Sequence, residues 1–318
     1  MQRYIIRRLL LAVPVLIGVS LTIFIVMRVI PGDIALAILG GEGSAGVSQE
    51  QLNDLRTQLG LNKPLYEQYG NWIWDFIRLN PGKSLQSGRP VMTHIQESFP
   101  VTLELVILSI AVSLLIALPI GVLSAMRQDT WVDYVFRVVS IGGLAMPVFW
   151  TGTLIIMVLV GTFGWLPPLG YTGFFENPVV NIQQVIWPSL AMGYYLSAAV
   201  SRMTRSQMLE VLRQDYIRTA WSKGLRERVI MYRHALKNAI LPVVTVTGIQ
   251  FGVLIGGAVL VEIVFVLPGM GTELVQAILR RDYPIVQTII MLIAAIYVLV
   301  NLGVDLLYAW LDPRIRYT

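Results

Sequence analysis

The chain has 318 residues, of which 55% are hydrophobic and only 14% are charged, and its mean hydropathy is +0.67. Soluble domains carry about a quarter charged residues, so this composition predicts an integral membrane protein. The absence of cysteine excludes disulfides, thiolate metal sites and thiol nucleophiles. His94 and His234 lie far apart, outside any metal-ligand spacing, and we expect no metal site. The net charge of +5 is informative through its distribution among loops, and we expect no nucleic-acid partner.

Six stretches of the sequence are long and apolar enough to be membrane spans. A spanning helix needs about 20 mostly apolar residues, because each residue rises about 1.5 Å across a core about 30 Å thick. The predicted spans are Leu9–Met27, Val101–Met126, Val138–Val160, Ile186–Val200, Val243–Val266 and Ile285–Trp310. The fourth is the shortest, and we expect its Pro188 to lie in the first helical turn, where proline is tolerated. The sequence therefore predicts an all-α protein with six transmembrane helices.

Basic residues flank these spans mainly on one side. Lys and Arg close to a span favour the cytoplasmic side, so the arginines before the first span place the N-terminus in the cytoplasm. Six crossings then place the segments 127–134 and 202–240 and the C-terminus there as well. The arginines concerned are Arg3, Arg7, Arg8, Arg127, Arg314 and Arg316, together with the basic residues of 202–240. A signal peptide is the competing interpretation of the N-terminus, but the apolar run is too long and lacks a small-residue cleavage site.

The long segment 31–100 is predicted to lie outside the cell, between the first two spans. After a flexible GGEGSAG stretch, Ser48 and Gln51 form a capping-box pattern that predicts a short helix ending near Gly60. A second helix follows Pro64 and has a one-sided apolar stripe. The stripe consists of Leu65, Tyr69, Trp72, Ile73, Phe76 and Leu79. We interpret it as packing against the chain's own spans or the membrane interface, and the segment as a structural lid. A further outer helix, TELVQAILRRD, has Thr272 as its candidate cap.

Motifs for nucleotide hydrolysis and nucleophilic catalysis are missing from the sequence. It contains neither a GxxxxGK[ST] phosphate loop nor a GxSxG nucleophile elbow, so we expect no enzymatic activity of its own. Glu104, Glu262 and Asp305 fall within predicted spans, where acids are functional candidates. Each lies near a helix end, and we expect it to reach the interface or pair with a neighbour. The alternative, an ATP-independent secondary transporter or channel, needs a deep acid with a relay partner.

The fifth predicted span carries a face of small residues. Gly248, Gly252 and Gly256 recur every four residues, and Gln250 adds a polar group to the same helix. Small residues at this spacing let helices approach closely in the membrane. The pattern favours internal helix packing as much as a subunit interface or a pathway wall, and both interpretations stay open.

The basic segment 202–240 has an ordered pattern as well as its charge. No Gly or Pro occurs from Met208 to Lys223, which predicts one helix, and Gly224 is predicted to end it. Its apolar stripe is Leu209, Leu212, Tyr216 and Ala220. Asp215 and Arg218 are spaced to pair on its surface, Lys223 lies in its last turn, and a second helical run from Leu225 leads to the fifth span at Pro242. Such a helix is suited to contact a partner protein.

Two stretches of this segment resemble a known motif. DYIRTAWSKG, Asp215–Gly224, and HALKNAILPVVT, His234–Thr245, resemble the EAA motif of permease subunits of ABC importers, with Arg218 in place of the usual Glu as in the peptide/nickel group. Further stretches resemble the B-type permease of that group. They are RYIIRRLLLAVPVLIGVSL, Pro31-Gly32-Asp33, LGLNKPLYEQY, SLQSGRPV, PVTLEL, SRMTRSQMLEVL, PGMGTELVQAILRRDYP and VDLLYAWLDPRIRY.

The resemblance implies a type I ABC importer permease fold in a prokaryotic inner membrane. The implied organisation is a first helix in 1–30, an extracytoplasmic segment in 31–100 and a core permease domain in 101–318. The implied partners are a homologous second permease, one or two cytoplasmic ATPase subunits that bind ATP and Mg, and an extracytoplasmic solute-binding protein, with no cofactor in this chain. The implied ATPase contact consists of Asp215, Arg218, Thr219, Ala220, Lys223 and Gly224. Di- or oligopeptides are the expected cargo, with nickel chelates, glutathione-like peptides and sugars as alternatives; a membrane scaffold without transport activity is a further alternative.

Overall fold

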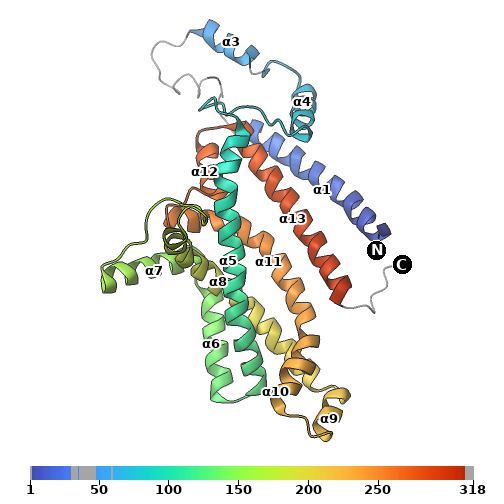
Figure 1. Cartoon of the computed structure of the whole chain (residues 1–318). Coiled ribbons are helices and arrows are strands. Elements are labelled where there is room, and N and C mark those ends of the chain that lie inside the picture. Colours follow the sequence, from blue (N-terminus) through green and yellow to red (C-terminus); the bar gives the residue numbers. More distant parts are fainter. Residues whose placement is uncertain (1, 30–34, 36–47, 59, 312–318) are drawn as a thin grey trace. The chain divides into compact units, whose positions relative to one another are not determined.

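The computed structural model describes residues 2–29, 35, 48–58 and 60–311 (Figure 1). Pro31-Gly32-Asp33, the GGEGSAG stretch and the tail with Arg314 and Arg316 lie outside the described residues. The described helices are α1 (Gln2–Val29), α3 (Gln49–Gln58), α4 (Leu65–Ile77), α5 (Val91–Met126), α6 (Trp131–Ala145), α7 (Val148–Phe163), α8 (Pro178–Leu212), α9 (Asp215–Ser222), α10 (Glu227–Val229), the π-helical segment η1 (Ile230–Leu236), α11 (Lys237–Val264), α12 (Met270–Leu279) and α13 (Tyr283–Leu311). An isolated antiparallel bridge joins Lys83 and Pro90. The predicted all-α class is confirmed.

The helices form two compact units. Unit 1 contains residues Met1–Pro100 and Gly269–Val298, and unit 2 contains Val101–Pro268 and Leu299–Thr318. Helices α5 and α13 therefore contribute residues to both units.

The long apolar helices agree with most of the predicted spans. Among the described residues, 4 helical stretches are long and apolar enough to cross a membrane, and up to 5 if α6 and α7 together form one bent span. The four are Ile5–Val29, Val91–Met126, Glu227–Val264 and Tyr283–Leu307. The predicted fourth span, Ile186–Val200, lies inside α8, which does not belong to this set. The number of six spans stays a prediction.

The predicted third span is not a continuous helix. Helix α6 ends at Ala145, and α7 leaves it at an angle of 104° (Figure 1). Pro147 explains the break, because its ring disfavours helical backbone in the preceding residue, and Met146 is extended with φ −98° and ψ 129°. The predicted span Val138–Val160 is therefore divided between two helices that meet at a bend, and it is not one continuous helix.

Helix α8 is longer than the fourth span that the sequence predicts. The side chain of Asn177 caps its N-terminus by accepting a hydrogen bond from the backbone N–H of Val180 at 3.3 Å, and Pro178 occupies the first turn. Pro188 is consequently a buried residue of the helix interior, which corrects its predicted place in the first turn. The residue that starts the helix lies ten positions earlier in the sequence.

Glycines bring α5, α6 and α8 of unit 2 close together. A Cβ atom added to Gly121 of α5 would lie 2.5 Å from Cβ of Thr204 on α8, and one added to Gly193 of α8 would lie 2.6 Å from Val112 Cγ1 on α5. One added to Gly143 of α6 would lie 3.1 Å from a backbone oxygen of α8. Such close approach fixes these three helices against one another through backbone contact.

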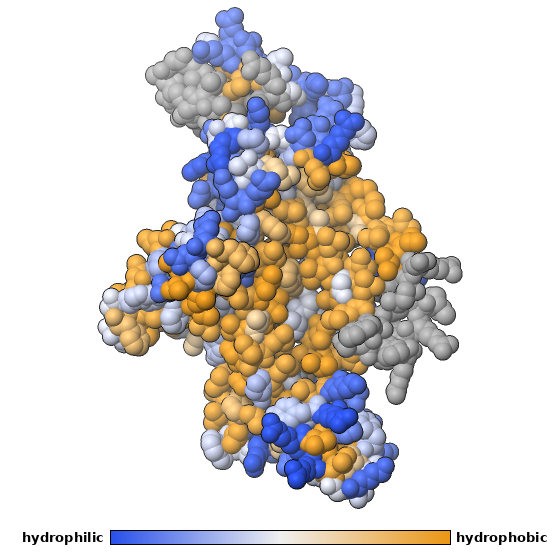
Figure 2. Space-filling view, in the orientation of Figure 1, coloured by the Kyte–Doolittle hydropathy of each residue, from blue (hydrophilic) through white to orange (hydrophobic). Residues whose placement is uncertain are grey.

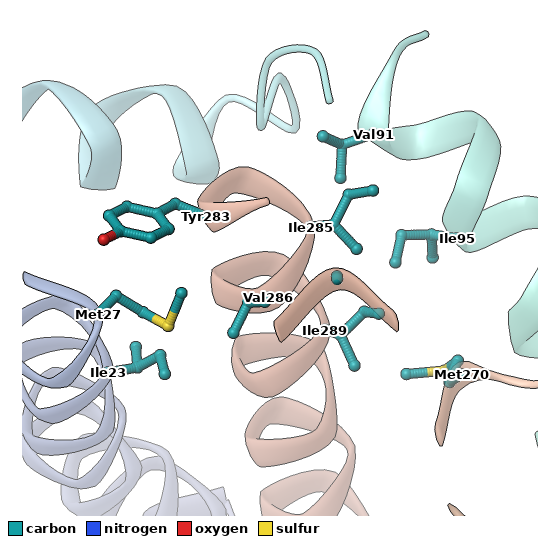
Figure 3. Close-up of a cluster of buried hydrophobic side chains, with 10 residues drawn as sticks. Ile23, Met27, Val91, Ile95, Met270, Tyr283, Ile285, Val286 and Ile289 are labelled. Carbon is teal, nitrogen blue, oxygen red and sulfur yellow. The ribbon is translucent and has the colours of Figure 1, made fainter. Parts of the chain in front are cut away.

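The core of unit 1 is an apolar cluster from α1, the first turns of α5, α12 and the first turns of α13 (Figure 3). Its buried members are Ile23, Met27, Val91, Ile95, Met270, Ala277, Tyr283, Ile285, Val286 and Ile289. Helix α4 packs on α1, where the Phe24 ring lies 5.3 Å from that of Tyr69 and 6.1 Å from that of Trp72. Tyr69 and Trp72 of the predicted stripe thus pack against the chain's own first span, as predicted, whereas Leu65 and Leu79 are 61% and 77% exposed and Leu79 lies beyond the end of α4.

Two predicted helix starts in unit 1 have different outcomes. The capping box of α3 is confirmed, since the backbone N–H of Ser48 donates to Gln51 Oε1 at 3.1 Å and that of Gln51 donates to Ser48 Oγ at 3.2 Å. Helix α12 begins at Met270 with Gly269 in the cap position. Thr272 lies inside this helix, so its prediction as the cap was wrong.

Candidate coupling site around α9

The chain turns between α8 and α9 at Gln214, a residue type that does not predict a helix break from the sequence. Helix α8 ends at Leu212, Gln214 is extended with φ −75° and ψ 147°, and α9 begins at Asp215. The prediction of one helix from Met208 to Lys223 was therefore wrong. The turn directs Ile217 and Ala220 into an apolar cluster, while Tyr216, a predicted stripe residue, is 44% exposed. Burial of two apolar side chains explains why a segment without Gly or Pro still breaks.

An apolar cluster in unit 2 holds α9 in place. Its buried residues come from α5, α8, α9, η1 and α11. They are Val122, Ala125, Met208, Ile217, Ala220, Ile230, Met231, Ala235 and Ala239. Displacement of α9 would expose these side chains, so its movement is tied to the ends of the long helices.

The C-terminus of α9 is closed by a glycine turn. Gly224 has φ +70°, a left-handed conformation that favours glycine. Its backbone N–H donates to the Trp221 carbonyl at 2.9 Å, and that of Leu225 donates to the Ala220 carbonyl at 3.4 Å. This is the hydrogen-bond pattern of a Schellman motif. The prediction that Gly224 ends the helix is confirmed, with Lys223 at the C-cap.

The outer face of α9 is exposed and mixes charge with aromatic rings. Arg218 Nη1 lies 3.4 Å from Asp215 Oδ1, with the two side chains 75% and 95% exposed, so this pair contributes little stability. Trp221 is 46% exposed on the same helix. Hydrophilic residues cover much of the surface around α9 and α10 (Figure 2). This face is available to a partner protein.

The six residues of the predicted ATPase contact lie together on or beside α9 but not on one face. Asp215, Arg218, Thr219, Lys223 and Gly224 are exposed. Ala220 is 7% exposed and packs inward. It supports α9 from below instead of offering a contact.

A hydrogen bond that sequence reasoning missed joins α9 to α11. Asn238 Nδ2 donates to Tyr216 Oη at 2.9 Å and to the His234 carbonyl at 2.9 Å. Between α9 and Asn238 the chain forms α10 and then η1, a wider π-helical segment of seven residues that precedes Pro242 in α11. Tyr216 and Asn238 are 22 positions apart in the sequence, which is too far for helical periodicity to reveal their contact.

The glycine face of α11 divides into two parts. A Cβ atom added to Gly248 would lie 2.1 Å from Val304 Cγ2 of α13, so this glycine serves internal packing. One added to Gly256 would meet nothing within 4 Å, and Gly256 is exposed. Gly252 and Gln250 are partly buried.

Two acids of unit 2 have hydrogen-bond partners, as expected for structural roles. Glu104 Oε2 accepts from Tyr171 Oη at 2.6 Å and from Asn181 Nδ2 at 3.1 Å. Glu262 is fully buried, and its Oε1 accepts from Thr102 Oγ1 at 2.6 Å. Burial, together with the hydrogen bond to the Glu104 carboxylate, raises the pKa of the Tyr171 phenol. The connector between α7 and α8 is thereby attached to α5.

Comparisons with known proteins cover the whole chain. A family described as "Binding-protein-dependent transport system inner membrane component" matches residues 117–317, and the family of its N-terminal part matches residues 1–106. A dipeptide transport system permease of Alkalihalophilus pseudofirmus is 40% identical over 100% of both chains. One of Escherichia coli K12 is 38% identical over 100% of this chain and 99% of the relative, and a putative peptide transport system permease of Brucella abortus is 38% identical over 100% of both. This chain therefore belongs to the family of inner membrane components of binding-protein-dependent transport systems.

Proposed function

We propose that this chain forms the translocation pathway of an ATP-driven importer of di- or oligopeptides together with a homologous second permease. The proposal of a peptide cargo rests on one observation: the chain is 38–40% identical, over its full length, to permeases that are named for dipeptides or peptides. The chain is a multi-pass inner membrane protein, in keeping with its long apolar helices.

We assign α9 as the contact for a cytoplasmic ATPase subunit. Three features support this role: an exposed polar and aromatic face, an apolar base that ties α9 to α5, α8 and α11, and a glycine turn that fixes its end. Exposed charges such as those of Asp215, Arg218 and Lys223 would set the orientation of docking more than its affinity. The sequence has no phosphate loop, so ATP and Mg are assigned to the partner and no catalysis to this chain.

The assignment of α9 sets the proposed orientation when it is combined with the predicted six spans. Both termini then lie in the cytoplasm, and the segment 31–100 lies outside, where a solute-binding protein delivers the cargo. For the second permease, the exposed part of the α11 glycine face around Gly256 is the proposed contact, because exposed small residues let a second helix approach closely. Gly252 continues this face toward Gly248, whereas Gln250, two positions from each of these glycines, lies on the opposite side of α11.

The test is transport by the complete complex. The chain is co-expressed with the second permease and the ATPase subunits, and the purified complex is placed in proteoliposomes with the binding protein. We expect uptake of a labelled dipeptide that requires ATP and the binding protein. Uptake by the isolated chain driven by a proton gradient would instead support a secondary transporter.

A further inference from the structure

Asp133 is a fully buried carboxylate that connects three helices of unit 2. Its Oδ1 accepts from Arg205 Nε of α8 at 2.8 Å, and its Oδ2 accepts from Arg205 Nη2 at 2.7 Å. Ser124 of α5 donates to Oδ1, and the backbone N–H of Asp129 donates to Oδ2 at 3.1 Å. Arg137 Nη2 lies 3.3 Å from Oδ2. One side chain on α6 is thus fixed to α5, to α8 and to the turn before α6.

The geometry of this cluster controls orientation more than stability. A guanidinium that binds both oxygens of a carboxylate permits one relative orientation of the two side chains. The gain is opposed by the desolvation of a buried charge, so apolar residues of similar volume would stabilise the helices about as well. The effect of the ion pair is therefore to hold α6 and α8 in one defined arrangement.

The Asp133–Arg205 pair lies on the route from α9 to the rest of unit 2. Arg205 lies two turns before Leu212, the last residue of α8, and α9 follows directly. Next to the pair, Gly121 of α5 meets Thr204 of α8. A displacement of α8 at this end therefore moves α5 and α6 with it.

The route continues beyond α6. Helix α6 leads through the bend at Pro147 into α7. A Cβ atom added to Gly152 of α7 would lie 2.9 Å from Cε2 of Phe265, directly after α11. A joint displacement of α5, α6 and α8 would thus be passed through α7 to the residue that follows the C-terminus of α11.

We propose that Asp133 and Arg205 form a coupling clasp, a pair of positioning residues that makes α5, α6 and α8 move as one body when the ATPase displaces α9. This inference rests on the proposed function of α9. Neither residue is assigned a contact with the cargo. The clasp converts a local push on α9 into a concerted movement of the membrane helices.

The test compares two identical substitutions at neighbouring aspartates. Asp133→Asn removes the negative charge of the clasp and leaves Arg205 charged. Asp129→Asn removes an exposed negative charge four positions earlier and keeps the hydrogen bond from the Asp129 backbone N–H to the residue 133 side chain. In proteoliposomes with the binding protein, we expect Asp133→Asn to keep ATP hydrolysis within about twofold while dipeptide imported per ATP falls at least about fivefold. The ratio for Asp129→Asn should equal that of the wild type.

A second variant covers the case in which Asp133→Asn fails to assemble. Arg205→Lys keeps the ion pair but loses the two-point contact, so we expect assembly with an intermediate loss of cargo imported per ATP. Parallel losses of hydrolysis and uptake in this variant, with the ratio unchanged, would show that the pair only stabilises the fold. The same fall in ratio for Asp129→Asn would also overturn the clasp.

A distance measurement tests the rigid body directly. Because the chain has no cysteine, spin labels can be attached to Trp131→Cys on α6 and Ser206→Cys on α8, both exposed positions. We expect one label distance in the nucleotide-free and ATP-bound complex, and a broadened, state-dependent distribution after Arg205→Lys. A wild-type distance that changes between states would refute the clasp alone. A wild-type complex without ATP-dependent uptake would refute the proposed function with it.

Discussion

The amide nitrogen of Asn238 lies 2.9 Å from the hydroxyl oxygen of Tyr216 and joins the exposed face of α9 to the first turn of α11. The apolar cluster beneath α9 holds the helix from the opposite side. A push on α9 would therefore reach α11 through a polar contact and α5 and α8 through packing. One prediction follows from the hydrogen bond, and three more follow from the Gly224 turn, from the helix packing of unit 2 and from the Asp282 carboxylate of unit 1.

Tyr216→Phe should weaken coupling without preventing assembly. The lost hydrogen bond is exposed, so the free energy of unfolding should fall by about 1 kcal/mol or less. If α9 is the ATPase contact, as proposed, this hydrogen bond would transmit part of its movement to α11, and we expect ATP hydrolysis stimulated by the binding protein to fall about two- to fivefold. Tyr232→Phe, at an exposed tyrosine of η1, is the control. Equal stimulation in the two variants would rule out a role for the Tyr216–Asn238 contact.

Substitutions at Gly224 should follow the ability of each residue to adopt a positive φ. A Cβ atom there would meet nothing within 4 Å, so the cost is conformational and not steric. We expect Gly224→Asn to be mild, Gly224→Ala to cost about 1 kcal/mol and Gly224→Val to cost more. ATP-dependent uptake of a dipeptide should decline in that order. Uptake by the Val variant at the Asn level would contradict the glycine turn as the device that orients α9.

Two glycine substitutions should separate internal packing from an exposed face. A Cβ atom at Gly193 would lie 2.6 Å from Val112 Cγ1 and 2.8 Å from the Ser109 carbonyl oxygen. Gly193→Ala should therefore destabilise the isolated chain in detergent by about 1–3 kcal/mol, which thermal unfolding measures. Gly256→Ala should not lower the free energy of unfolding and should raise it by up to about 1 kcal/mol, because its Cβ meets nothing within 4 Å and alanine favours the helix. Similar melting temperatures for the two variants would show that α5 and α8 separate more easily than their backbone contact implies.

Asp282→Asn should loosen the segment before α5 in unit 1. The buried Asp282 carboxylate accepts from Ser84 Oγ at 2.5 Å, from the Leu85 N–H at 3.2 Å and from the Gln86 N–H at 3.4 Å. An amide has one acceptor oxygen, so at least one donor loses its partner at a cost of about 1–3 kcal/mol. Hydrogen exchange of the two backbone amides should accelerate.

The exposed ion pair between Arg89 and Glu97 provides the control for this measurement. Glu97→Gln removes a carboxylate from the same region without touching Asp282, and exchange at Leu85 and Gln86 should stay at the wild-type rate. If Asp282→Asn leaves exchange equally slow, the carboxylate is not what holds this segment.

The sequence by itself determined the membrane class, the all-α fold, the long apolar helices and the glycine turn after α9. These features depend on local quantities, namely the length of an apolar run, a capping pattern at Ser48 and Gln51, and the backbone freedom of Gly224. The bend at Pro147 belongs to the same class, because the restriction on Met146 is local and could have been recognised.

Only the tertiary structure decided which of the spaced apolar residues turn inward and which distant side chains meet. The break at Gln214 depends on the cluster that receives Ile217, and no local pattern describes that cluster. Asp133 and Arg205 are separated by 72 positions, and their contact depends on the way α6 packs against α8. Helical periodicity states which residues share a face, whereas the partner of that face is set by packing between helices far apart in the chain.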